Sequence, residues 1–163
     1  MIVDDRTDRR PLLSFRLRGA ENWRSLLKTG ANLLVVGPRC ALEAFVAAAA
    51  SEMSDPVWLV GPTQEIPIEH TGTFVLYDAS RLDGAQQEAL LALLSTAEAV
   101  RPQIISLSEK HLWVEDGSSA IPDDLYYRLN TICLEVEPDA GQAGREPLMR
   151  AFDRAQETIR AAG

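Results

Sequence analysis

The chain has 163 residues, 46% of them hydrophobic, and a net charge of −8 with a sequence pI of about 4.8. This length and apolar content suffice for one domain with a real core, and not comfortably for two. The negative charge, without a basic run or zinc-ligand spacing, argues against direct nucleic-acid binding. No apolar stretch approaches the ~20 residues that span a bilayer, and the N-terminus is charged, so we expect a cytoplasmic protein without a membrane segment.

Short β-branched apolar runs alternate with longer helical patterns, which is typical of βαβ units and a parallel sheet. A short helix is predicted over 22–28, stopped at Gly30. Five buried strands are predicted over 33–37, 57–61, 73–77, 103–107 and 131–136. Helices are predicted over 41–53 and 85–99, the second with Leu90, Leu91 and Leu94 facing the sheet. The fold class is therefore α/β with a five-stranded parallel sheet.

After residue 138 the composition changes to a Gly-containing stretch, 139–144, followed by a helical pattern. The apolar residues of that pattern are Leu148, Phe152, Ala155 and Ile159. Their spacing gives the helix one apolar face, which packs either on this domain or on a partner. We divide the chain into an α/β core with an N-terminal extension, 1–138, and a linker with a C-terminal amphipathic helix, 139–163.

The chain has two cysteines, Cys40 and Cys133, which fits a reducing compartment. Neither has a Cys or His partner at ligand spacing. We expect both to be small core residues, and neither a disulfide, a metal ligand nor a catalytic thiol.

The segment 123–132 reads Asp-Asp-Leu-Tyr-Tyr-Arg-Leu-Asn-Thr-Ile. It resembles the DLYYRLN signature of the AAA+ ATPase domain that activates sigma-54 RNA polymerase. Residues 72–94 are similar to the family's GTLFLDEI segment and the leucine pattern after it, and 104–112 are similar to its RIIAATN segment. The resemblance covers roughly 33–138. It implies a P-loop NTPase-like three-layer sandwich, with the family's lid domain largely absent.

Residues 37–44 stand where the family has its phosphate loop, GESGTGKE. Such loops need glycines, so that backbone N–H groups can surround the phosphates, and a lysine to meet their charge. Here Gly37 is kept and Glu43 stands at the lysine position. That exchange turns an attraction into a repulsion on the order of 4 kcal/mol near a protein surface. Arg39 is a candidate replacement cation, although an arginine in an exposed turn is usually solvated.

The resemblance also implies that the other nucleotide-facing positions are changed. Tyr77 stands at the metal-binding aspartate, and Asp78 at the glutamate that orients water, where we interpret it as a strand-end acid. Glu109 replaces the sensor asparagine, and His111 is expected on the surface. We therefore assign no catalytic residue and no metal ligand, and treat Gly37, Arg39, Glu43, Asp78 and Glu109 as remnants that face a former nucleotide site.

Of the two family arginines that contact a neighbouring subunit, Arg128 is kept, while the other falls at Pro122. Tyr126, Tyr127 and Arg128 form the candidate interface. An ion pair of Arg128 with Asp123 or Asp124 is the simpler alternative. The connection between Gly61 and Gly72 lacks the family's GAFTGA insert, which implies that the sigma-54 contact is missing.

These changes favour a non-catalytic AAA+-derived regulatory or adaptor module that acts by protein contacts, in bacterial transcriptional regulation. It would need no cofactor, and its partner would be another protein, such as an AAA+ regulator, or a second copy of itself. The alternative is a weak, non-hydrolysing ATP or ADP sensor that uses Arg39 and backbone amides. An active ATPase is disfavoured because the lysine, the metal ligand and the sensor are all replaced.

Overall fold

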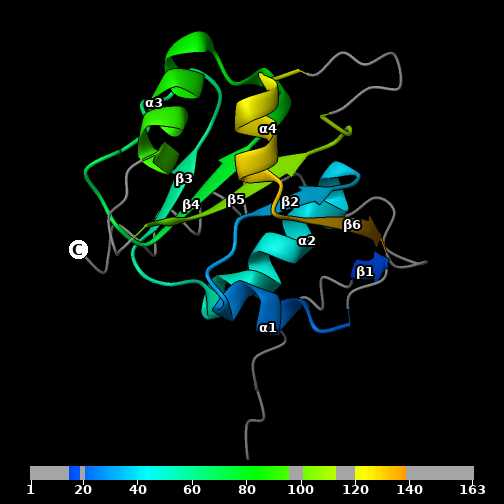
Figure 1. Ribbon diagram of the computed structural model, residues 1–163. Coiled ribbons are helices and arrows are strands. Elements are labelled where there is room, and N and C mark those ends of the chain that lie inside the picture. Colours follow the sequence, from blue (N-terminus) through cyan, green and yellow to red (C-terminus); the bar gives the residue numbers. More distant parts are fainter. Residues whose placement is uncertain (1–14, 19–20, 96–100, 113–119, 139–163) are drawn as a thin grey trace, which may run out of the picture.

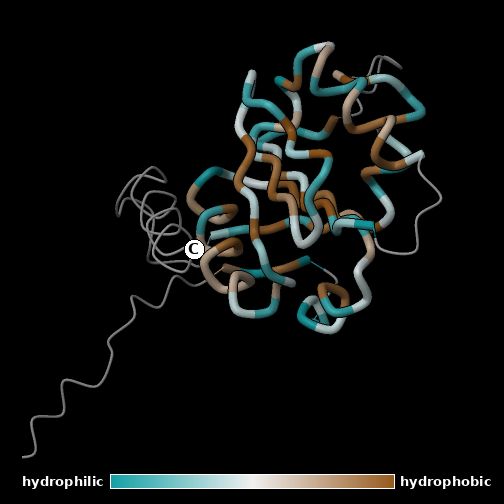
Figure 2. The backbone as a smooth tube through the Cα atoms, turned by 90° about the vertical axis from the view of Figure 1, so that its left-hand side faces the viewer, coloured by the Kyte–Doolittle hydropathy of each residue, from teal (hydrophilic) through white to brown (hydrophobic). Residues whose placement is uncertain are grey.

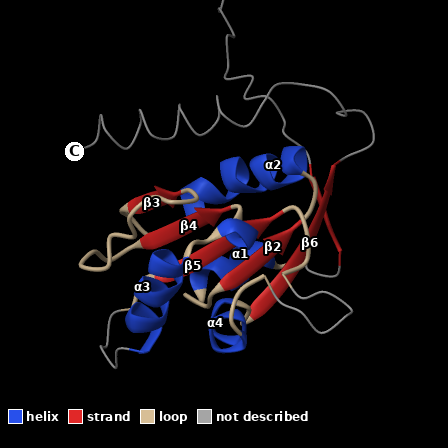
Figure 3. Ribbon diagram, turned by 90° about the horizontal axis from the view of Figure 1, so that it is seen from above, coloured by secondary structure: helices blue, strands red, loops and turns tan. Residues whose placement is uncertain are grey.

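One six-stranded sheet with helices on both faces forms the fold (Figures 1 and 3). The computed structural model describes residues 15–18, 21–95, 101–112 and 120–138. The predicted C-terminal helix and the N-terminal segment 1–14 lie outside these residues. None of the described helices has the length and apolar character needed to cross a bilayer.

The helices are α1 (Trp23–Lys28), α2 (Arg39–Ala49), α3 (Gly84–Ser95) and α4 (Asp123–Leu129), with short 3-10 turns at Ala50–Glu52 and Ala79–Arg81. The strands are β1 (Phe15–Arg18), β2 (Leu33–Val36), β3 (Val57–Val60), β4 (Thr73–Tyr77), β5 (Gln103–Ser108) and β6 (Ile132–Pro138). Their order in the sheet is β1-β6-β2-β5-β4-β3. The α/β class and all five predicted strands are confirmed, with ends that differ by one or two residues.

The prediction of a five-stranded, wholly parallel sheet is wrong at one edge. A sixth strand, β1, pairs antiparallel with β6, whereas the other pairs are parallel. In β1, Phe15 and Leu17 pack on the core and alternate with the exposed Arg16 and Arg18. Four residues of such alternation are too short a signal to stand out in the sequence.

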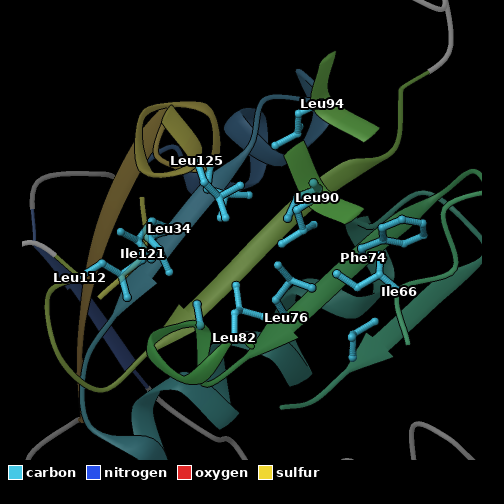
Figure 4. Close-up of a cluster of buried hydrophobic side chains, with 14 of the residues drawn as sticks. Leu34, Ile66, Phe74, Leu76, Leu82, Leu90, Leu94, Leu112, Ile121 and Leu125 are labelled. Atoms are coloured by element: carbon cyan, nitrogen blue, oxygen red, sulfur yellow. The ribbon is translucent and has the colours of Figure 1, made fainter. Parts of the chain in front are cut away.

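Two apolar cores lie on opposite faces of the sheet. One core joins α1 and α2 to the sheet through residues such as Trp23, Phe45 and Val35. The other joins α3 and α4 to it, where Leu34, Leu76, Leu90 and Leu125 point toward one another (Figure 4). Figure 2 shows the apolar stretches concentrated in the central strands. The alternating sides of β2, β4 and β5 supply both cores, as expected for strands covered on both faces.

Two polar side chains hold the amino ends of β2 and β5 to their surroundings. Gln103, 6% exposed, donates its amide to the carbonyls of Leu27 (3.1 Å) and Ala31 (2.8 Å). Asn32 accepts a bond from the Ile104 N–H at 3.0 Å and donates one to the Arg128 carbonyl at 3.0 Å. These bonds join the end of α1, the sheet and the end of α4, because buried polar groups must find partners.

We predict that Ser106→Ala leaves the protein as stable as the wild type or raises its free energy of unfolding by about 1 kcal/mol. Ser106 is fully buried in β5, and its hydroxyl has no hydrogen-bond partner among the described residues. Urea unfolding measures the change. The matched control is Ser108→Ala, which removes a hydroxyl that bonds the Lys110 carbonyl and should lower stability by about 1 kcal/mol. A clear loss in Ser106→Ala would contradict the assignment.

Candidate functional site

The carboxyl ends of β2 and β5 form the candidate site. These strands are neighbours, and the helices that follow them, α2 and α4, lie on opposite faces of the sheet (Figure 3). In open α/β sheets, ligands bind at such a reversal, outside the carboxyl ends of the strands. Gly37, Arg39 and Glu43 follow β2, Asp78 follows β4, and Glu109 follows β5. The topology therefore brings the five residues that were predicted to face a nucleotide toward the carboxyl ends of the strands.

The connection from β2 to α2 is only two residues long, Gly37 and Pro38. The Gly37 N–H already bonds the Ser108 carbonyl at 3.1 Å, and proline has no N–H to offer. The N–H groups of Ala41 and Leu42 bond the Pro38 carbonyl at 2.9 and 3.1 Å. A phosphate loop needs several backbone N–H groups that curl around an anion, and here the helix begins where that curl would be.

Gly37 is required by a close approach between neighbouring strands. A Cβ atom at this position would overlap the Val136 carbonyl oxygen of β6 and lie 2.7 Å from the Val136 Cγ2. The glycine of the former loop is therefore explained by packing between β2 and β6, without any role for a ligand.

Glu43 lies on α2 with 9% of its surface exposed. Its carboxylate is 3.7 Å from the guanidinium of Arg39, one helical turn earlier. The two charges that the sequence places near the nucleotide thus pair with each other. Arg39 remains mostly exposed, with 58% of its side chain accessible.

Asp78 adopts a left-handed backbone conformation, with φ 60°, directly after β4. Its carboxylate accepts a hydrogen bond from the Ser80 hydroxyl at 2.9 Å and lies 3.5 Å from Arg81. These local partners agree with a strand-end acid that stabilises the turn.

Tyr77 covers the backbone of Gly61, where an added Cβ would lie 3.1 Å from the ring Cε2. An aromatic ring thus occupies the position that the resemblance assigns to a metal ligand.

The loop after β3 is held by one buried side chain that sequence reasoning missed. Gln86, 4% exposed, accepts bonds from the N–H groups of Thr63 (3.2 Å) and Asp83 (3.1 Å). Its amide donates to the carbonyls of Gly61 and Gln64, both at 2.8 Å. The Gln86 N–H in turn bonds the Asp83 carboxylate at 2.8 Å, which completes a capping box at the start of α3. The Asp-x-x-Gln spacing was the available signal.

The candidate interface on α4, formed by Tyr126, Tyr127 and Arg128, lies away from the carboxyl ends of the strands. The helix ends beside the amino ends of β2 and β6, where Ile132 begins its pairing with Leu33. Arg128 donates to the Leu94 carbonyl at the end of α3, at 3.2 Å, in place of the expected pair with Asp123 or Asp124. Tyr127 is 67% exposed and meets the Tyr126 ring edge-on at 5.4 Å. The structure therefore places Arg128 away from the carboxyl ends of the strands.

Both cysteines are exposed, so the prediction that they are core residues is wrong. Cys40 is the second residue of α2, at the open end of the helix. Cys133 alternates with the core residues Leu134 and Val136, and so lies on the same face of β6 as Glu135. Although Cys133 is exposed by surface area, surrounding atoms partly desolvate its thiol, and this desolvation, followed by the negative charge of Glu135, raises the pKa of the thiol. His111 is exposed as expected, 3.3 Å from Glu135. No group of three metal-binding side chains gathers within the described ranges.

We predict that Glu135→Gln speeds alkylation of Cys133 by iodoacetamide at neutral pH by a factor of about two to three. Removing the carboxylate lowers the thiol pKa and so increases the thiolate fraction that reacts. Peptide mass spectrometry after timed quenching separates Cys133 from Cys40, which serves as the internal control. An unchanged rate of Cys133 alkylation would contradict the contribution of the Glu135 charge to the raised pKa of the thiol.

Arg128→Ala should lower the free energy of unfolding by about 1 kcal/mol, because it removes a charged donor from the last turn of α3. Thermal and urea unfolding measure the effect. Arg101→Ala, which removes the same charge from an exposed loop position, should change stability by less than about 0.5 kcal/mol. Equal losses in the two variants would show that the bond to Leu94 contributes nothing.

No family model and no curated protein matches the chain. Among solved structures, the fold is similar to NtrX from Brucella abortus in complex with ATP, with a TM-score of 0.52 and 18% identity over 69% of this chain and 34% of that chain. NtrX in complex with ADP gives a TM-score of 0.51 and 18% identity over 85% of this chain and 39% of that one. The chain thus spans well under half the length of NtrX. At this identity the likeness shows a related α/β fold.

Proposed function

We propose that this chain is a non-catalytic regulatory or adaptor module, derived from the AAA+ domain of sigma-54 activators, that works by protein contacts in bacterial regulation. It neither hydrolyses nor tightly binds ATP. On this proposal its sheet and two helical layers are a P-loop NTPase-like core that has lost its phosphate loop.

The observation that carries the proposal is the two-residue connection between β2 and α2. A phosphate loop requires about four residues between its first glycine and the glycine-lysine pair that opens the helix. In this chain α2 already includes Arg39, and the nearby N–H groups of Gly37, Ala41 and Leu42 are all bonded within the protein. These bonds and the early start of α2 support the proposal that the usual cradle of N–H groups is missing.

The charges around the connection support the same conclusion. Glu43 carries a carboxylate toward the start of α2, and Arg39 pairs with it. A triphosphate entering this position would meet one repelling charge and a cation that is already engaged. Asp78 is likewise engaged by Ser80 and Arg81, and Tyr77 has no carboxylate with which to hold Mg²⁺.

The origin of the module is supported by two independent likenesses. The sequence resembles the sigma-54 activator domain most closely over 72–94 and 125–130, and the fold is similar to that of NtrX, which has been crystallised with ATP and with ADP. A fold kept without its nucleotide chemistry is most simply used as a scaffold for contacts.

A role in protein contacts is supported by the surface of α4. Tyr127 is one of two large hydrophobic residues that are exposed within the described part of the chain. Its ring meets that of Tyr126 edge-on at 5.4 Å, and a tyrosine has only two side-chain torsions to fix on binding. Rigid, exposed tyrosines are enriched at protein interfaces. Arg128 already donates a hydrogen bond to the Leu94 carbonyl within the domain. We therefore assign the proposed contact to Tyr127.

We predict no measurable heat when the protein is titrated calorimetrically with ATP or ADP at millimolar concentration in the presence of Mg²⁺. The same result is expected for Glu43→Lys, because restoring the lysine does not restore the loop of N–H groups. Circular dichroism of both proteins establishes that they are folded.

Saturable heat with the wild type would contradict the proposal and favour the nucleotide sensor. In that case Arg39→Ala, at the one cation near the start of α2, should abolish the heat. Binding gained only in Glu43→Lys would show that charge, and not the short connection, excludes the nucleotide.

A further inference from the structure

β3 forms one edge of the sheet and pairs with β4 alone. Within the part of the chain that the structure describes, no other strand or side chain hydrogen-bonds to its outer edge. An edge of this kind presents unpaired N–H and C=O groups to any extended chain that approaches it.

The two edges of the sheet differ in their side chains. The opposite edge strand, β1, carries the exposed Arg16 and Arg18, and Arg18 is 2.8 Å from Glu137 on β6. Charged residues of this kind discourage pairing with further strands. β3 has the sequence Val-Trp-Leu-Val, without a charge, and its first three residues are only half-buried. As far as the described residues go, the sheet is thus protected at β1 and open at β3.

The loop after β3 adds one exposed apolar side chain to this part of the molecule. Ile68 is 49% exposed, and His70, two residues later, stacks on the Trp58 ring with centroids 4.5 Å apart. The Trp58 indole N–H bonds the Thr71 carbonyl at 3.1 Å. These contacts hold the loop beside the strand, so that its apolar side chain is positioned before any partner arrives.

The same half of the sheet carries most of the negative charge. Residues 51–95 contain seven carboxylates and one arginine, and one of the seven, Glu52, pairs with Arg24 and Lys28 of α1. Glu65 and Glu69 of the loop and Glu88 of α3 are exposed. A field of one sign over this region attracts cationic partners and repels a second copy of itself.

We propose that β3 accepts an extended, positively charged segment of a partner protein as a seventh strand of the sheet. The main chain would supply the hydrogen bonds, Ile68 and the half-buried side chains of β3 the apolar contact, and the surrounding carboxylates the preference for lysine and arginine. Pairing of two copies through β3 is the competing occupant. It is disfavoured because it would bring the exposed carboxylates Glu65, Glu69 and Glu88 of two copies together. This inference rests on the proposed role in protein contacts and names a surface apart from α4.

The test uses the full chain and a synthetic peptide of alternating lysine and valine. A second peptide of the same charge has proline at its central valine, which removes a main-chain donor. Hydrogen exchange of the amides of residues 57–60 is followed by mass spectrometry or NMR, and affinity by calorimetry. We expect the alternating peptide to slow exchange in β3 and to bind less tightly as salt is added. The proline peptide should bind at least fivefold more weakly, since several main-chain bonds are lost with the register.

Single variants locate the contact. Ile68→Lys should weaken binding of the alternating peptide about fivefold, because it replaces apolar contact with a like charge. Glu69→Lys should weaken it about twofold to fivefold. Glu21→Lys, which makes the same charge change at an exposed position before α1, should leave the affinity nearly unchanged. Ile68, Glu69 and Glu21 are exposed, so these variants keep the fold.

Equal affinity for the two peptides would overturn the proposal, because charge alone would then explain binding. No binding, or no slowing of exchange in β3, would also overturn it. Concentration-dependent dimerisation that Ile68→Lys abolishes would assign the edge to a second copy instead. The nucleotide titration is independent of these readouts: heat with ATP would overturn the proposed function and leave the exchange result in β3 standing.

Discussion

At the carboxyl ends of the strands, the structure depends on one contact among three strands at Gly37. Its N–H bonds the Ser108 carbonyl of β5, and its missing side chain lets the backbone of β6 approach at Val136. The chain turns directly from this point into α2 through Pro38. Because the turn is so short, the first turn of α2 fills the space in which a longer loop could bind an anion. One packing constraint thus decides both how the strands meet and where α2 begins.

The amino ends of the strands, on the opposite side of the sheet, are held together in a different way. There, side-chain amides of Asn32 and Gln103 join loops and strands, and Arg128 joins α4 to α3. The signature that points to an ATPase relative is therefore, at least for its arginine, part of the internal support of the domain.

Most of the architecture could be predicted from the sequence because strands covered on both faces leave continuous apolar runs, as in Leu33–Val36 and Gln103–Ser108. β1 could not, since its signal is one alternation at an edge. The exposure of Cys133 depends on which strands the helices cover, and that is decided by packing between distant segments. The sequence pattern puts Gly37, Asp78 and Glu109 directly after strands, where the structure also has them. The bond of Arg128 to Leu94 and the four bonds of Gln86 could not be predicted, because they arise only in the folded chain.

Gln86 also limits how this domain can change over evolution. One amide bonds the loop at Gly61, Thr63 and Gln64 and the cap of α3 at Asp83, using its oxygen and its nitrogen twice each. Glutamate would replace two donors with a charge, and leucine would leave all four groups without a partner. An insertion between residues 61 and 64 would separate the groups that share this amide. Among relatives, therefore, the length of this loop and the identity of residue 86 should vary together, and a lengthened loop should be accompanied by loss of the glutamine.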